Sequence, residues 1–143
     1  MHPVGDVLHV HDWTVALIPA FLHALPTNDP RRKWATVLTI HNLEHQGIFS
    51  AEDFAQTGLP EAFFHLNGFE GHGNLNLLKG GISHATKITT VSPTYATEIC
   101  TAEGGCGLEG LLTHRGEDLT GILNGIDQDI WNPETDRHLS SHY

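Results

Sequence analysis

The amino-acid sequence predicts an α/β fold built on a parallel sheet with crossover helices. Four short runs rich in β-branched and apolar residues have the composition of strands, at residues 6–10, 36–40, 88–91 and 119–123. Helical patterns lie between these runs, and such alternation of strand and helix is typical of a parallel sheet. The length of 143 residues suits one domain with its own core, or a piece of a larger unit.

Three helices are expected between the strands. The first spans residues 14–25, and Pro19 inside it is expected to kink it. The charged residues 25–34 then form a surface connection to the second strand, and a second helical pattern covers residues 75–85. The third helix begins at Pro93, where a missing N–H costs nothing, and Ser92 is its expected N-cap.

The segment between Leu43 and Asn74 is long, rich in Phe, His and Gly, and without clear periodicity. Loops of this length in compact domains are usually functional. We therefore expect this segment to contribute to a site.

The composition excludes several classes of function. The net charge of −10, with only seven Lys and Arg, argues against a nucleic-acid partner. No apolar run approaches the roughly 18 residues of a membrane span, and the first residues lack the pattern of a secretory signal. Two cysteines suit a reducing compartment, so a cytoplasmic protein is expected, or one of the plastid stroma if the source is a plant or alga.

Polar side chains follow each expected strand at the point where it ends. In open parallel sheets, ligands bind outside the carboxyl ends of the strands, so these side chains predict one shared site. The residues at the four strand ends are His11 and Asp12, then His41 and Asn42, then Ser92, and finally Asn124 and Gly125.

Each of these residues also has a purely structural explanation. Asp12 precedes a helix and fits an N-cap equally well. His41-Asn42 and Asn124-Gly125 fit ordinary turns. Trp13 fits a core residue as well as a platform on which a sugar ring stacks. Only the recurrence at every strand favours a site.

Three further patterns are weaker evidence for a functional site. "GCGLEG", at residues 105–110, follows a helix, whereas a dinucleotide fingerprint follows a strand. Asp127 and Asp129 stand alone after a turn and are explained as solvated carboxylates. His9 and His11 share one strand face, but no zinc-site spacing accompanies them.

Several longer motifs are similar to one enzyme family. "HVHDWTVALIPAFL", "TVLTIHNLEHQGIF", "LLKGGISHATKITTVSPTYATEI" and "GILNGIDQDIWNPETD" resemble the segments, in order and spacing, of bacterial glycogen synthases and plant starch synthases. The resemblance implies the N-terminal half of a GT-B fold with a Rossmann-like sheet. It also implies a retaining glucosyltransferase that moves glucose from ADP-glucose to an α-1,4-glucan, without a cofactor or a metal.

The resemblance covers only part of such an enzyme. The family's Lys-Thr-Gly-Gly-type loop and its second, nucleotide-binding domain have no counterpart in residues 1–143. The chain is therefore expected to be part of the N-terminal domain, and to be inactive by itself. ADP-glucose is the expected donor, with UDP-glucose as the alternative.

The resemblance also assigns roles to the residues at the strand ends. It implies catalytic roles for His41 and Asp12, and substrate binding by a second set of residues, namely His11, Trp13, Asn42 and Asn124. Lys79 matches a family lysine with a structural or charge-balancing role. Cys106 departs from an aromatic residue common in the family, so the resemblance assigns no role to residues 104–110.

Two other functions fit the same residues. A sheet edge lined by His, Asp, Asn and Trp suits a glucan-binding module without chemistry. His9, His11 and Asp12 suit a metal-dependent hydrolase.

Overall fold

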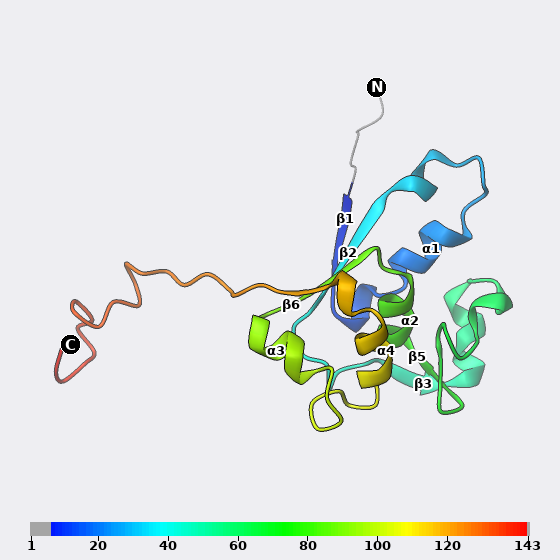
Figure 1. Cartoon of the computed structure of the whole chain (residues 1–143). Coiled ribbons are helices and arrows are strands. Elements are labelled where there is room, and N and C mark those ends of the chain that lie inside the picture. The colour runs from blue at the N-terminus through cyan, green and yellow to red at the C-terminus, as the bar shows by residue number, and fades with distance from the viewer. Residues whose placement is uncertain (1–6, 143) are drawn as a thin grey trace.

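The computed structural model describes residues 7–142, so residue 6 of the first expected strand lies outside the described residues. The main sheet contains four parallel strands in the order β1-β2-β6-β7, seen in Figure 1. Their bounds are β1 (Val7–His11), β2 (Ala35–Ile40), β6 (Lys87–Thr90) and β7 (Leu119–Gly121). All four expected strands are confirmed, and so is their parallel arrangement.

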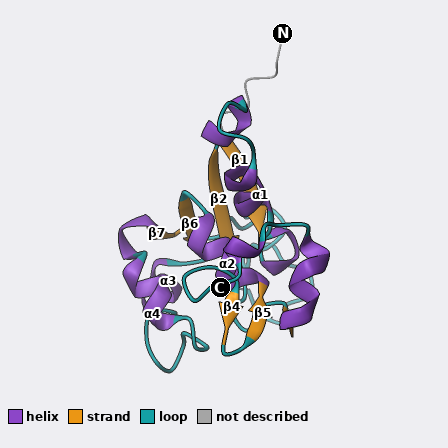
Figure 2. Cartoon of the chain, turned by 90° about the vertical axis from the view of Figure 1, so that its right-hand side faces the viewer, coloured by secondary structure: helices purple, strands orange, loops and turns teal. Residues whose placement is uncertain are grey.

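Four α-helices connect or follow these strands, namely α1 (Ile18–Ala24), α2 (Leu77–His84), α3 (Pro93–Glu98) and α4 (Glu109–His114). Figure 2 shows α1 and α2 in front of the parallel sheet. The expected start of α3 is confirmed, since Ser92 Oγ accepts a hydrogen bond of 2.9 Å from the N–H of Tyr95. The expectation did not include α4, which is too short to show a helical repeat.

The first helix differs from its expected form. A separate 3₁₀ helix, η1 (Trp13–Val15), precedes α1, and Pro19 lies at the second position of α1. A proline in the first turn removes no helical hydrogen bond, so Pro19 begins this helix and does not kink it.

The core forms where α2 packs on the centre of the main sheet. Its members are fully buried apolar residues, among them Leu38 and Ile40 of β2, Leu78 and Ile82 of α2, and Ile88 of β6. Two glycines of α2 allow close approach of its neighbours. A methyl group on Gly80 would overlap the ring of Phe69, and one on Gly81 would lie 2.7 Å from the Cβ of Ala16.

Residues 43–76 contain structure of their own, contrary to the expected long loop. Three short strands form an antiparallel sheet in the order β3-β5-β4, with bounds β3 (Ile48–Ser50), β5 (Asn74–Asn76) and β4 (Glu70–Gly71). The 3₁₀ helices η3 (Ala51–Thr57) and η4 (Glu61–Phe63) lie between β3 and β4. A second core around Phe54, Phe69 and Leu75 holds this region together. Strands of two or three residues are too short to show alternation in the sequence.

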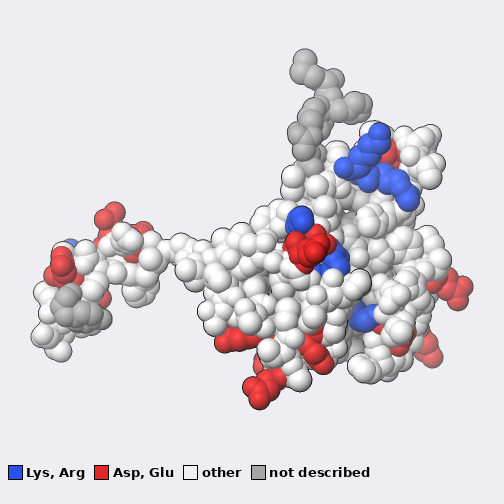
Figure 3. Space-filling model, in the orientation of Figure 1, with Lys and Arg blue, Asp and Glu red and all other residues white. Residues whose placement is uncertain are grey.

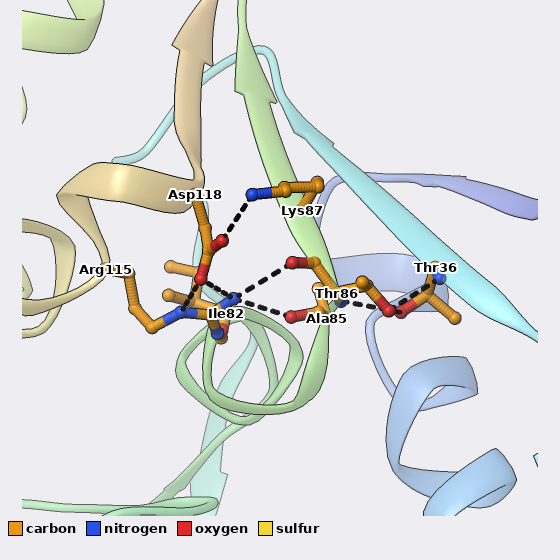
Figure 4. A network of polar contacts seen from close by, with 7 residues as sticks. All are labelled: Thr36, Ile82, Ala85, Thr86, Lys87, Arg115 and Asp118. Atoms are coloured by element: carbon orange, nitrogen blue, oxygen red, sulfur yellow. Dashed lines mark hydrogen bonds and ion pairs between the residues drawn. The ribbon is translucent and has the colours of Figure 1, made fainter. Parts of the chain in front are cut away.

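The guanidinium of Arg115, just after α4, joins α2 to the start of β6 (Figure 4). It donates hydrogen bonds to the carbonyl oxygens of Ile82, of Ala85 at 2.7 Å and of Thr86 at 3.5 Å. Its Nε also donates to Asp118, whose other carboxylate oxygen accepts from Lys87 at 2.6 Å. Because Asp118 leads directly into β7, this network fixes β7 beside β6.

After β7 the chain leaves the body of the molecule as an extended arm, residues 122–142 (Figure 1). The large apolar residues of the arm are between 38% and 73% exposed, namely Ile122, Leu123, Ile126, Ile130, Trp131 and Leu139. In residues 7–142, no helix combines the length and the apolar character needed to cross a membrane.

Candidate functional site at the ends of β1 and β2

The ends of β1 and β2 are tied together by Asp12. Its N–H donates to the carbonyl oxygen of Thr39 at 2.9 Å, which continues the ladder between the two strands by one residue. Its carboxylate Oδ1 then accepts a hydrogen bond of 2.8 Å from the N–H of His41. Asp12 therefore does not cap the following helix η1, which receives no side-chain hydrogen bond from it.

The backbone of Asp12 is strained. Its φ of 56° and ψ of −171° lie in a region that is essentially reserved for glycine. Such a conformation typically costs about 1–3 kcal/mol and persists only where its surroundings enforce it. Here the two hydrogen bonds to β2 enforce it, and together they carry the Asp12 carboxylate to the N–H of His41.

Three imidazole rings line the same strand ends. Nδ1 of His11 lies 3.0 Å from Nε2 of His41, and the ring of His9 stacks on that of His11 with centroids 4.4 Å apart. His9 Nε2 is hydrogen-bonded to Thr39 Oγ1 at 2.6 Å, and Thr39 Oγ1 to Thr89 Oγ1 at 2.6 Å. The structure thus brings together His11, Asp12 and His41, as the strand-end pattern predicts.

The other expected site residues lie outside this cluster, or their side chains already form a hydrogen bond or pack against the core. Asn42 Oδ1 accepts the N–H of Glu44 at 2.9 Å, which is the turn interaction. Trp13 is half-buried, packs against the main core and lies 6.1 Å from the ring of Phe49. Asn124 is exposed on the arm, three residues beyond β7, and no turn forms at Asn124-Gly125.

Two residues that the sequence did not indicate support the loop after β2. The hydroxyl of Tyr95 accepts the N–H of Leu43 at 3.1 Å, which joins α3 to this loop. The buried side chain of Gln46 accepts from Asn76 Nδ2 at 2.6 Å and donates to the carbonyl oxygen of Cys106 at 3.0 Å. The only signal for Tyr95 is its place three residues after the N-cap Ser92, and Gln46 has none.

A cavity of about 360 Å³ opens beside Gln46. Its lining includes Asn76, Lys79, His72 and Cys106. Lys79 Nζ donates to the carbonyl oxygens of Leu66 and of Gly68, the latter at 3.2 Å. Burial lowers the pKa of Lys79, and the nearby carboxylate of Glu70 opposes that shift. These contacts give Lys79 a structural role in holding residues 66–68.

Most cations of the chain are engaged in internal contacts. Besides Lys79, Lys87 and Arg115, these are Arg31, which pairs with Asp29, and Arg32, which donates to the carbonyl oxygens of His23 and Leu25. The pair with Arg31 lowers the pKa of Asp29 to about 2. Figure 3 shows Lys and Arg gathered over η2 (Pro30–Lys33), which precedes β2 and so lies away from its carboxyl end.

The geometry does not favour a metal centre at His9, His11 and Asp12. Asp12 Oδ1 is hydrogen-bonded to His41, and His9 Nε2 to Thr39. Among residues 7–142 no group of three His, Cys, Asp or Glu side chains is arranged to hold a metal ion. Asp127 Oδ1 accepts the N–H groups of Asp129 and Ile130 at 3.0 Å, so it caps a local turn.

Comparison with known proteins identifies relatives along nearly the whole chain. Residues 2–114 match the family described as the starch synthase catalytic domain. Glycogen synthase 2 of Geobacter sulfurreducens is 53% identical over 139 residues, which is 96% of this chain and 29% of that protein. The glycogen synthase of Roseobacter denitrificans is 51% identical over 138 residues, which is 96% of this chain and 28% of that protein.

A solved structure agrees with these matches. It is the catalytic domain of starch synthase IV from Arabidopsis thaliana bound to ADP and acarbose, with a TM-score of 0.79 and 37% identity. The match covers 96% of this chain and 29% of that chain, so this chain spans less than a third of the relatives it matches. The resemblance of the sequence motifs is thereby confirmed. The chain belongs to the starch synthase catalytic domain family and has the α/β fold of its GT-B glycogen and starch synthases.

Proposed function

We propose that this chain is a segment of the N-terminal domain of a glycogen or starch synthase, where it orients the glucosyl unit that is transferred. The supporting observation is the convergence of His11, Asp12 and His41 at the carboxyl ends of β1 and β2, where parallel sheets bind ligands. The proposed donor is ADP-glucose and the proposed acceptor is an α-1,4-glucan. The ADP in the related starch synthase IV structure supports the donor.

The proposed reaction breaks the bond between glucose C1 and the diphosphate oxygen, and forms a bond between C1 and the 4-hydroxyl oxygen of the glucan. The hydroxyl proton leaves with the released ADP. Positive charge develops on the sugar ring and negative charge on the diphosphate, so the site must stabilise both. His41 orients glucose hydroxyls, and Asp12, whose Oδ1 is engaged, uses Oδ2 toward a sugar hydroxyl.

The remaining expected roles involve residues outside this cluster. Trp13 and Asn42 shape the acceptor side of the site, because they adjoin Asp12 and His41 in the chain. Asn124 reaches the sugar from the arm when the second domain of the longer protein is present. We also assign the diphosphate-binding cations to that longer protein, since five of the seven Lys and Arg here are engaged internally.

A chimera tests this function. This chain replaces the matching segment of the Geobacter sulfurreducens glycogen synthase 2, and transfer of labelled glucose from ADP-glucose to glycogen is measured. We expect transfer by the chimera and none by the isolated chain. His41→Ala is expected to lower kcat about 10²- to 10³-fold with little change in KM for the donor.

The control is His114→Ala on the exposed end of α4, which is expected to leave kcat unchanged. A well-folded chimera in which His41→Ala keeps normal turnover contradicts the proposed function. Co-sedimentation of the isolated chain with glycogen, together with a folded but inactive chimera, would favour the glucan-binding module instead.

A further inference from the structure

We infer that His11 is a positioning residue that holds the imidazole of His41 in a single tautomer, and not a residue that contacts the sugar. The central observation is the distance of 3.0 Å between His11 Nδ1 and His41 Nε2. The kinetic consequence of this inference rests on the proposed function, whereas the tautomer itself can be measured without it.

The hydrogen bond couples the proton positions of the two rings. A neutral imidazole carries its proton on one nitrogen, and the other nitrogen accepts. If His41 Nε2 donates, His11 Nδ1 is bare and the proton of His11 lies on Nε2. If His11 Nδ1 donates, His41 Nε2 is bare and its proton lies on Nδ1. In both cases the two rings adopt the same tautomer, so fixing His11 also fixes His41.

His11 is itself held by a chain of contacts that reaches into the sheet. Its ring stacks on His9 with an interplanar angle of 29°, because residues two apart on a strand share a face. His9 is anchored by Thr39, and Thr39, which is buried, by Thr89, each at 2.6 Å. This chain links β6, β2 and β1, and it ends at the ring of His41.

The backbone of His41 is fixed separately from its ring. Asp12 binds its N–H, so the Cα of His41 stays in place whatever happens at His11. The ring depends on His11, since within the described residues no other hydrogen bond reaches the His41 imidazole. Substitution of His11 is therefore expected to release the ring of His41 without moving its backbone.

The fixed tautomer decides what His41 offers to a ligand. With the proton on Nε2, Nδ1 of His41 is an acceptor for a sugar hydroxyl, and with the proton on Nδ1 it is a donor. A ring that alternates between tautomers spends only part of its time in the form that suits the substrate. A single tautomer is a preorganised one.

Nitrogen-15 NMR of the histidine rings, recorded on the 143-residue chain near pH 8, measures the tautomers of His11 and His41 directly. In the wild-type chain we expect His11 and His41 to show the same single tautomer. His11→Phe keeps a ring on His9 but removes both nitrogens, and is expected to leave His41 as a mixture of tautomers. His11→Asn is expected to recover the hydrogen bond to His41 Nε2, because its amide carries a donor, Nδ2, and an acceptor, Oδ1, on Cγ, where histidine carries Nδ1. His114→Phe is the matched control on α4 and leaves His41 unchanged.

Two results of this measurement overturn the inference. One is opposite tautomers of His11 and His41 in the wild-type chain. The other is an unchanged single tautomer of His41 in His11→Phe. Circular dichroism of each variant identifies any loss of fold, and the comparison of the His11 and His41 tautomers in the wild-type chain still tests the inference if His11→Phe fails to fold.

The chimera with the Geobacter sulfurreducens enzyme tests the consequence. His11→Phe is expected to lower kcat about 10- to 100-fold, with KM for ADP-glucose within about twofold, because the ring is misplaced and the binding groups remain. His11→Asn is expected to recover most of kcat. Loss of the single tautomer with unchanged kcat overturns the positioning role. Absence of transfer by the folded wild-type chimera refutes the proposed function, and the NMR result still decides the role of His11.

Discussion

The carboxylate of Asp12 accepts the backbone N–H of His41 at 2.8 Å, across the ends of two neighbouring strands, although the two residues are 29 positions apart in the chain. This contact requires Asp12 to adopt a backbone conformation that suits glycine. Strain of this kind is typical of residues whose side chain must reach one particular place. The relationship explains why a carboxylate, and not a glycine, directly follows β1.

Substitutions of Asp12 separate the strain from the contact. Both Asp12→Gly and Asp12→Ala remove the carboxylate, but only glycine adopts φ 56° and ψ −171° without strain. We expect Asp12→Gly to be more stable than Asp12→Ala by about 1–2 kcal/mol, after allowance for the greater freedom of glycine in the unfolded chain. Urea unfolding of the two variants measures this difference. Equal stabilities would show that the surroundings do not enforce the strained conformation.

Two helical glycines are expected to respond in opposite ways to alanine. Gly80→Ala places a methyl group in the ring of Phe69, so it is expected to destabilise the fold by several kcal/mol or to prevent folding. Gly110→Ala on α4 meets no atom within 4 Å and is expected to stabilise the fold by about 0.5–1 kcal/mol. Thermal unfolding compares the two. A Gly80→Ala variant as stable as the wild type would contradict the close packing of α2 against Phe69.

The network around Arg115 predicts that substitution of this one residue greatly lowers the stability of the fold. Arg115→Met keeps the aliphatic volume but leaves the carbonyl oxygens of Ile82 and Ala85 without this partner, and is expected to cost about 2–3 kcal/mol in the free energy of unfolding. Arg115→Lys is expected to recover only part of it, since one ammonium nitrogen does not reach all the acceptors that the three guanidinium nitrogens reach at once. Denaturant unfolding of both variants measures the losses.

The comparison variant is Arg31→Met, whose exposed pair with Asp29 is expected to contribute little. Similar losses for Arg115→Met and Arg31→Met would refute a special role for the Arg115 network.

The pH dependence of stability is expected to reflect His84. Its ring packs against the rings of Phe63 and Phe69, at centroid distances of 5.2 Å and 5.6 Å. Burial lowers the pKa of His84, assisted by the nearby charges of His23, His65 and Arg115 and opposed by the hydrogen bond to the carbonyl oxygen of Gly80. The pKa of His23 is also lowered, by burial and by Arg32.

The direction of this pH dependence follows from the number of protons bound by the folded and the unfolded chain. Because the folded pKa of His84 is below the ordinary histidine value of 6.5, the unfolded chain binds more protons just below that pH. The free energy of unfolding is therefore constant above about pH 7 and falls as the pH drops below about 6.5, until the pH reaches the lower folded pKa. Urea unfolding between pH 5 and pH 8 checks this trend. His84→Phe should reduce the slope, and the exposed His114→Phe should not.

The candidate site could be predicted in part. The repeated polar residues after each strand indicated that His11, Asp12 and His41 meet, because parallel strands present their carboxyl ends at one edge. The same reasoning placed Asn124 with them, and this stays a prediction: Asn124 follows β7, which is separated from β2 by β6. A pattern at strand ends predicts at which edge of the sheet the residues lie, but it does not predict how far apart they lie along that edge.

The sequence by itself determined the elements whose signals are local. The four strands follow from runs of β-branched residues, and the start of α3 from Ser92 and Pro93, because composition and capping act between neighbours in the chain. Its motifs also determined the family. The antiparallel sheet of residues 48–76, with strands of two or three residues, gave no such signal, because strands this short form only against their partners.

Only the tertiary structure decided the roles of the side chains. Asp12 has the sequence signature of an N-cap, yet its carboxylate binds His41, and His11 meets the ring of His41 across 30 residues of chain. Arg115 likewise finds its carbonyl partners about 30 residues away. A carboxylate, an imidazole or a guanidinium has several possible partners of similar strength. The packing of distant segments brings one of those partners within hydrogen-bonding distance, and no local pattern in the sequence records which one.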